Sequence, residues 1–166
     1  SLSDASALRR RLLLATPLLA LAGCGFELKR AAELHFDSIA LTGFEPRSPL
    51  AQELRTTLER SITVKEAPAQ AQVVLQALSE QRPRRAVAFT ASGQVRDIQV
   101  RTIFRYRAQT PSERELIPDS RIELIREMSF IESAALGKQQ EEQDLFREMQ
   151  SDIVLQVMLR LSTIRL

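Results

Sequence analysis

The sequence predicts an α+β fold: a four- to five-stranded, mostly antiparallel or mixed sheet with two helices packed on one face, as a two-layer sandwich. Two segments, one following residue 49 and one near the C-terminus, have apolar residues at the four-residue spacing of an amphipathic helix. Several segments between them alternate apolar and polar residues, which is the period of a half-buried strand. One helix therefore interrupts a meandering sheet, and the other follows it.

The first strand is expected at Phe36–Leu41, and it ends before Gly43. Ser48 and Pro49 predict a helix start, because a serine side chain caps free backbone amides and the first helical residue does not need the amide that proline lacks. The apolar residues of this helix recur at Leu50, Leu54, Leu58 and Ile62. One amphipathic helix therefore follows the first strand.

Four later segments alternate with a period of two and are expected to be strands: Gln72–Leu78, Arg85–Thr90, Val95–Arg107 and Arg121–Phe130. Gly93 lies between the second and the third, where a hairpin turn needs a residue with positive φ. Residues 111–118 are expected to form a loop. The order of the strands stays open, as does whether the last segment is a fifth strand or an extension of the fourth.

The longest of these segments has two different faces. The apolar face consists of Ile98, Val100, Thr102, Phe104 and Tyr106. The opposite face consists of Gln99, Arg101, Ile103, Arg105 and Arg107. We expect the helices to cover the apolar face and the arginine face to be exposed, as an antiparallel sheet allows.

The C-terminal helix carries an apolar stripe formed by Leu145, Met149, Ile153, Val157 and Leu161. Gly137 lies either at a break just before this helix or in a weak first turn. The acids Glu141, Glu142 and Asp144 in its early turns are most simply a solvated helix face, and carboxylates are favourable near a helix N-terminus.

Three arginines, an apolar stretch and small residues precede Cys24, the single cysteine. This order is typical of a secretory signal peptide, and an apolar stretch of roughly ten residues is too short for a membrane span of about twenty. Leu21-Ala22-Gly23-Cys24 resembles a bacterial lipobox, which implies cleavage before Cys24 and acylation of its thiol and its new amine. We therefore expect a signal peptide at residues 1–23, a lipidated tether at 24–35 and a single α+β domain at 36–166.

Charge argues against a general nucleic-acid binder. The chain has 23 basic and 21 acidic residues, and without Arg9, Arg10, Arg11 and Asp4 of the leader it keeps 20 of each. The distribution is uneven, because seven arginines and a single acid, Asp97, lie in the segment 82–107. A block of this kind indicates a local anionic partner.

Residue types needed for catalysis are scarce. His35 is the only histidine and has no second histidine or free cysteine to pair with, so the composition offers no metal site of nitrogen and sulfur ligands, and we expect no cofactor. The sequence has neither a nucleophile elbow nor a glycine-rich phosphate loop. We therefore expect that the protein is not an enzyme.

Arg101, Arg105 and Arg107 form the most distinctive chemical feature, because they share one strand face. Guanidinium groups match phosphate and carboxylate oxygens in a bidentate manner, and Ile103 among them offers an apolar contact. An alternative is that this face is solvated and paired with nearby acids such as Glu123 and Glu127. The sequence leaves both interpretations open.

Motifs in order along the chain resemble the LptE family of lipopolysaccharide-assembly lipoproteins. They are Leu21-Ala22-Gly23-Cys24-Gly25-Phe26-Glu27-Leu28, Ser48-Pro49-Leu50, Ser92-Gly93-Gln94, Ala135-Leu136-Gly137-Lys138 with Glu142, and Glu148-Met149 with Asp152, Gln156 and Arg160-Leu161. The resemblance covers nearly the whole expected mature chain, and its specificity comes from the order and spacing of the motifs.

This resemblance implies a lipid-anchored protein at the periplasmic face of the outer membrane that plugs and helps assemble the LptD β-barrel and binds lipopolysaccharide during insertion into the outer leaflet. Arg101, Arg105, Arg107 and Lys138 are the residues we expect to contact lipopolysaccharide phosphates. The hairpin tip offers Thr90-Ala91-Ser92 in place of a cation, which argues against a lipid-binding role for the tip. The alternative function is an accessory outer-membrane lipoprotein that contacts protein only.

Overall fold

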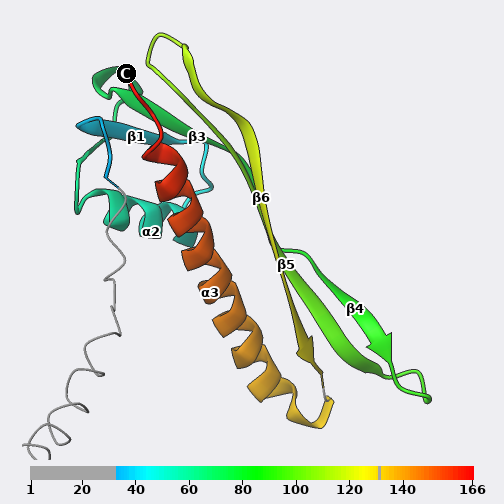
Figure 1. Cartoon of the computed structure of the whole chain (residues 1–166). Helices are drawn as coiled ribbons and strands as arrows, with labels where there is room; N and C mark the ends of the chain where they lie inside the picture. Colours follow the sequence, from blue (N-terminus) through cyan, green and yellow to red (C-terminus); the bar gives the residue numbers. More distant parts are fainter. Residues whose placement is uncertain (1–32, 131) are drawn as a thin grey trace, which may run out of the picture. The chain divides into compact units, whose positions relative to one another are not determined.

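The computed structural model describes residues 33–130 and 132–166, and this part of the chain is an α+β two-layer sandwich (Figure 1). In chain order the elements are β1 (Ser38–Thr42), α2 (Pro49–Leu58), β2 (Thr63–Lys65), the 3-10 turn η1 (Pro68–Gln70), β3 (Val73–Gln81), β4 (Arg84–Phe89), β5 (Val95–Gln109), β6 (Glu115–Ser129), the 3-10 turn η2 (Glu132–Ala134) and α3 (Ala135–Leu161). The predicted class is confirmed, with a mixed sheet of six strands instead of four to five.

β5 is the central strand of the sheet and pairs with three other strands. It pairs antiparallel with β6 along one side, and on its other side it pairs with β3 and then with β4, so that these two strands follow one another along the same edge. β1 runs parallel to β3, and β2 runs parallel to β1. Within the described residues β6 has β5 as its only strand partner, so its second edge is free.

The structure settles what the pattern left open about β6. The segment 121–130 lies mostly within a strand of its own that begins earlier, at Glu115, so the predicted loop 111–118 is wrong over its last residues. Ile117 pairs with Ala108 and is buried, which draws this end of the segment into the sheet. Pro118 is tolerated because it lies at a register shift on an edge strand.

β2 was not predicted, because its three residues are too few to show a period. The predicted helix start is confirmed, since Ala51 N donates a 3.1 Å hydrogen bond to the Ser48 side chain. α2 nevertheless ends at Leu58, so Ile62 of the predicted stripe lies beyond the helix. Gly137 lies in the first turn of α3, which is the second of the two placements expected for it.

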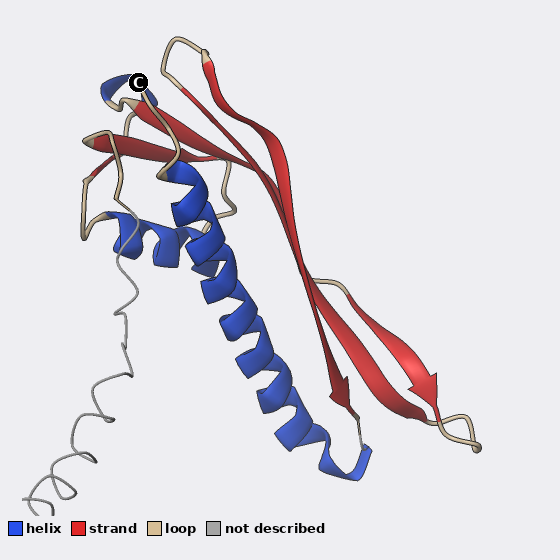
Figure 2. Ribbon diagram, viewed as in Figure 1, coloured by secondary structure: helices blue, strands red, loops and turns tan. Residues whose placement is uncertain are grey.

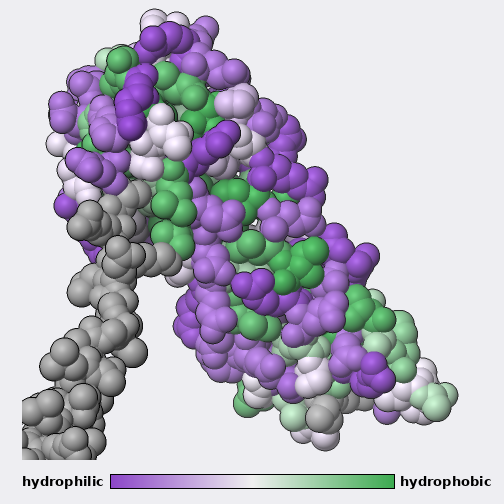
Figure 3. Space-filling view, viewed as in Figure 1, coloured by the Kyte–Doolittle hydropathy of each residue, from purple (hydrophilic) through white to green (hydrophobic). Residues whose placement is uncertain are grey.

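Both helices lie on one side of the sheet (Figure 2). The larger core cluster joins β1, α2, β3, the second half of β5 and the C-terminal part of α3. A second, smaller cluster lies under the first half of α3 and consists of Ile98, Val100, Met128 and Met149. On the exterior, hydrophobic surface is visible along the seam between α3 and the strands β5 and β6, and again over β4 (Figure 3).

One irregularity in the alternation of β6 has a structural role. Arg126 interrupts the apolar pattern of the strand, and its guanidinium lies 3.1 Å from the carboxylate of Asp152 on α3. The pair joins the sheet to the helix layer at a partly exposed position. An ion pair of this exposure contributes about 0–1 kcal/mol to stability, so its main effect is to orient β6 and α3 relative to one another.

Candidate functional site

The arginine face of β5 is arranged as the alternation predicts. Ile98, Val100, Thr102, Phe104 and Tyr106 are buried against the helices, whereas Arg101, Ile103, Arg105 and Arg107 lie on the opposite, more exposed face. Neighbours on β6 add Arg121, Glu123 and Ile125 to that face, because directly paired residues of antiparallel strands point the same way. We call this surface the β5–β6 outer face.

Each predicted arginine of β5 has a partner within the sheet. Arg101 lies 3.2 Å from the carboxylate of Glu123, and Arg107 Nε donates a 2.8 Å hydrogen bond to Gln76 Oε1. Arg105 donates from Nε to Asp119 Oδ1 at 3.3 Å and from Nη2 to Asp119 Oδ2, and these contacts raise the pKa of the Arg105 guanidinium above its ordinary value. The predicted alternative, pairing with local acids, is therefore present for Arg101 through Glu123 and for Arg105 through Asp119.

Gln99 is the centre of this polar surface, and only 8% of it is exposed. Its Oε1 accepts hydrogen bonds from Arg85 Nε at 3.1 Å and from Arg101 Nε at 2.9 Å, and its Nε2 donates to Glu127 at 2.9 Å. The other expected acid, Glu127, thus contacts the arginines only through Gln99. A neutral amide holds two guanidinium groups close together, which concentrates positive charge on β4 and β5.

Apolar side chains lie among these charges. Ile103 is partly exposed between Arg101 and Arg105, and Ile125, which is 41% exposed, is paired with Arg101. The β5–β6 outer face can therefore offer both cations and apolar contacts to one ligand.

Lys138 is separate from the arginine row. It lies in the first turn of α3, where its Nζ contacts Ser129 Oγ at 3.1 Å and Glu141 at 2.7 Å. Ser129 pairs with Asp97 near the start of β5, whereas Arg105 and Arg107 lie in the other half of that strand. The structure thus does not bring the four predicted residues together at one point, and Cys24 lies outside the described residues.

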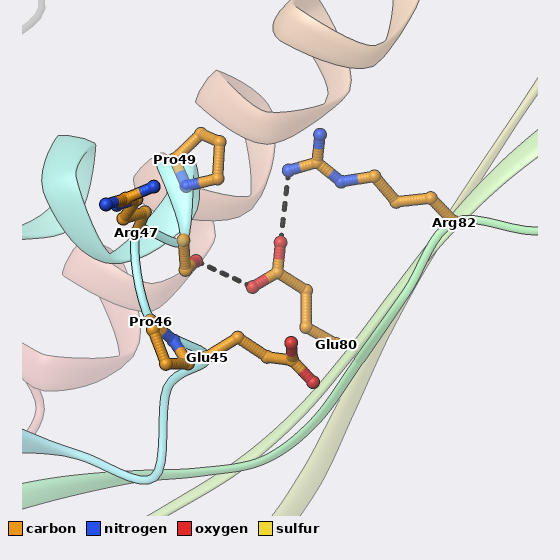
Figure 4. A pocket seen from close by; sticks show the side chains of 7 residues that line it. Glu45, Pro46, Arg47, Pro49, Glu80 and Arg82 are labelled. Carbon is orange, nitrogen blue, oxygen red and sulfur yellow. Dashed lines mark hydrogen bonds and ion pairs between the residues drawn. The ribbon is translucent and has the colours of Figure 1, made fainter.

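A polar network between the layers was missed by the sequence argument (Figure 4). Glu80 at the end of β3 accepts a 2.7 Å hydrogen bond from Ser48 Oγ and lies 3.0 Å from Arg82. Arg82 also donates to Gln150 of α3 at 2.9 Å, and Gln150 donates to Glu53 of α2 at 2.6 Å. These partners are up to 97 residues apart in sequence, so no local pattern could have indicated them.

Glu80 and Arg82 also line an open pocket of about 300 Å³ at the start of α2, together with Glu45, Pro46 and Arg47. Glu80 and Arg82 already have partners within this network, so we regard the pocket as part of the polar contact between the two layers. Within residues 33–130 and 132–166 no group of three His, Cys, Asp or Glu side chains is placed to hold a metal ion. The same part of the chain contains no helix that combines the length and the apolarity needed to cross a membrane.

The chain is an α+β domain whose β5–β6 outer face carries paired arginines and partly exposed apolar side chains. A model of the LptE family, described as lipopolysaccharide-assembly, matches residues 36–161, and the chain belongs to this family. The expected family membership is thereby confirmed. No curated protein gives a significant match to the chain.

Solved structures of three lipoproteins share the fold. Lipoprotein B from Nitrosomonas europaea is 24% identical with a TM-score of 0.72, over 83% of this chain and 90% of that one. A minor lipoprotein from Acinetobacter baumannii is 14% identical with a TM-score of 0.64, over 78% and 93%. Rare lipoprotein B from Shewanella oneidensis is 20% identical with a TM-score of 0.62, over 74% and 93%.

Proposed function

We propose that the protein is an outer-membrane lipoprotein that seats in an LptD-type β-barrel and binds lipopolysaccharide during its insertion into the outer leaflet. Membership of the lipopolysaccharide-assembly family supports the general role. The observation that carries the finer proposal is the β5–β6 outer face, where guanidinium groups lie beside the partly exposed Ile103 and the exposed Ile125. Lipid A is a phosphorylated glycolipid, so a protein that binds it needs both kinds of contact.

The partners of the arginines do not prevent such binding. The pairs of Arg101 with Glu123 and of Arg105 with Asp119 are partly exposed, and exposed ion pairs contribute about 0–1 kcal/mol. A phosphate dianion carries more charge than a carboxylate and presents several acceptor oxygens to a guanidinium fork. Phosphate can therefore replace these carboxylates at small cost.

Charge reversal tests this proposal directly. The double variant R101E/R105E should weaken binding of lipid A by about tenfold or more, because each lost charged hydrogen bond is worth roughly 1.5–3 kcal/mol. The measurement is a titration of the full chain with lipid A in detergent micelles, with circular dichroism to verify that the variant is folded.

The matched control is R55E/R147E. Arg55 is partly exposed and Arg147 exposed, and both are ion-paired, but they lie on α2 and α3, away from the β5–β6 outer face. This variant carries the same change of net charge and should bind lipid A as the unmodified protein does. Equal binding by both double variants would falsify the assignment of this face.

A second function, an accessory lipoprotein that contacts protein only, is favoured by one observation. Arg101, Arg105 and Arg107 all have partners within the sheet, as the arginines of a purely structural surface would. This function predicts co-purification with the barrel and no saturable binding of lipid A by the unmodified protein. The titration above therefore separates the two functions.

The lipid anchor on Cys24 belongs to the same proposal and rests on the lipobox sequence. Cells expressing the protein should incorporate labelled palmitate into it, and C24A should lose the label and appear in the soluble periplasmic fraction. We expect C24A to lose the label because the thiol of Cys24, the only cysteine, is the acceptor of the diacylglycerol group in this proposal. Label retained by C24A would show that this cysteine is not the acylated residue.

A further inference from the structure

A second pocket lies where the strands β5 and β6 meet the C-terminal half of α3. It has a volume of about 340 Å³ and is lined by Tyr106, Ser120, Arg121, Ile122, Gln156 and Arg160. The pocket is open, and its volume lies at the lower end of the range of small-ligand sites, which is about 300–1,000 Å³. Tyr106 belongs to the buried face of β5, so the pocket opens on the helix side of the sheet, and Arg121 at its rim is the one lining residue that it shares with the β5–β6 outer face.

Arg160 is the principal charge of this pocket. Within the described residues no carboxylate lies within 4.0 Å of its guanidinium, whereas Arg121 lies 2.7 Å from Glu123. Gln156 is one helical turn before Arg160 and presents an amide on the same side of α3. The pocket thus has one uncompensated cation with neutral polar groups around it.

The electrostatics of Tyr106 support this arrangement. Burial raises the pKa of the Tyr106 hydroxyl above its ordinary value of 10.0, and the charge of Arg160 acts in the opposite direction. The guanidinium is therefore close enough to favour a negative oxygen at this end of the tyrosine ring. An external anion in the pocket would experience the same field.

We propose that this pocket binds a phosphate monoester carried on a sugar, with Arg160 as the cation that holds the phosphate. Gln156 and the Tyr106 hydroxyl are neutral donors for the remaining phosphate oxygens, and Ile122 offers an apolar contact to the sugar ring. Soluble sugar phosphates and the phosphorylated sugars of a glycolipid share this chemistry. The site does not rest on the proposed function, because Arg160, Gln156 and Tyr106, which would contact the phosphate, do not belong to the β5–β6 outer face.

The protein carries its own probe for the test. Tyr106 is the only tyrosine and the chain has no tryptophan, so the ultraviolet fluorescence of the full chain reports on this pocket. Titration with glucosamine 1-phosphate at constant ionic strength should give a saturable change, and glucosamine without phosphate should give none. The variant R160Q should weaken the binding by about tenfold or more, as expected for a lost charged hydrogen bond.

A second readout separates a binding role of Arg160 from a merely structural one. Removing the positive charge should raise the pKa of Tyr106 further, which ultraviolet titration of the tyrosinate measures without any ligand. Bound sugar phosphate should raise the pKa of Tyr106 in the unmodified protein for the same reason. An unchanged pKa in both experiments would overturn the proposal.

Two control variants test whether the effect of R160Q is specific to this pocket. R147Q removes another arginine of α3, one paired with Asp144, and should bind glucosamine 1-phosphate normally. R101E/R105E should also bind it normally, so failure of the outer face and failure of this pocket are distinguishable. Equal affinity of R160Q and the unmodified protein, or loss of affinity in R147Q or R101E/R105E, would refute the site.

Lipid A in micelles distinguishes the sources of the phosphate. Competition by lipid A in the unmodified protein, absent in R160Q, supports a glycolipid as ligand of this pocket. Binding of glucosamine 1-phosphate without competition by lipid A supports a soluble sugar phosphate. Either result supports the pocket, and absence of both kinds of binding refutes it.

Discussion

Gly43→Ala is expected to lower the free energy of unfolding by about 4 kcal/mol, since backbone strain and overpacking each cost roughly 1–3 kcal/mol. Gly43 follows β1 with a φ of +74°, which favours glycine, and a Cβ atom there would overlap the carbonyl oxygen of Ala77. Ala77 belongs to β3 and is paired with Tyr106 of β5, so its backbone cannot move away without disturbing the sheet. Urea denaturation followed by circular dichroism measures the loss.

Gly93→Ala is the matched control. Gly93 has a similar φ of +81°, but a Cβ atom there would meet nothing within 4 Å. The variant should therefore lose only the conformational advantage of glycine, about 1–2 kcal/mol. Equal losses for the two alanine variants would show that the close approach of Gly43 to β3 does not limit stability.

Phe104→Ala is the second substitution with a large expected effect, about 3–5 kcal/mol of unfolding free energy. The Phe104 side chain is fully buried in β5 and stacks between Phe44, with ring centroids 5.9 Å apart, and Tyr106, at 5.2 Å. Removing the ring leaves a cavity in the larger core cluster, and Phe44 and Tyr106 each lose their stacking contact with Phe104. The midpoint of urea denaturation should fall while the fold persists at low denaturant.

Phe89→Ala makes the same chemical change at an exposed position. Phe89 is 58% exposed at the end of β4, so its loss should change stability by no more than about 0.5 kcal/mol. A cost at Phe89 that approaches the cost at Phe104 would contradict the view that the larger cluster carries the stability of the domain.

The parts of the fold that could be predicted are those whose signal is local. The alternation of β5 gives its two faces correctly, because each residue of a regular strand turns its side chain opposite to the next. The cap of α2 follows from Ser48 and Pro49, since capping involves only residues of the first turn. Gly93 marks the hairpin turn for the same reason, and its φ is positive as expected.

Features that depend on distant partners could not be predicted. β2 exists because three residues find a parallel partner in β1, and three residues carry no period. The early start of β6 depends on the burial of Ile117 beside Ala108 of β5. Glu80 and Gln150 look like ordinary surface residues in the sequence, although they join β3 to both helices.

Only the part of the candidate site that depends on local strand geometry could be predicted. The shared face of Arg101, Arg105 and Arg107 follows from strand geometry alone. Their binding to Glu123, Asp119 and Gln76 depends on strand register, which the pattern did not determine. The position of Lys138 relative to the arginine row could not be predicted at all. Its motif lies at the start of a helix, and only the tertiary structure defines where that helix lies relative to the arginines.

The length of α3 has a consequence for the scale of the domain. With 27 residues and a rise of 1.5 Å per residue, the helix is about 40 Å long. A bilayer has a hydrocarbon core of about 30 Å and a total thickness of about 40–45 Å with its headgroups. If the domain enters a barrel with α3 along the barrel axis, the β4–β5 turn and the C-terminus, which lie towards opposite ends of this helix (Figure 1), would face opposite leaflets. A single domain could then present different surfaces to the periplasm and to the cell exterior at the same moment.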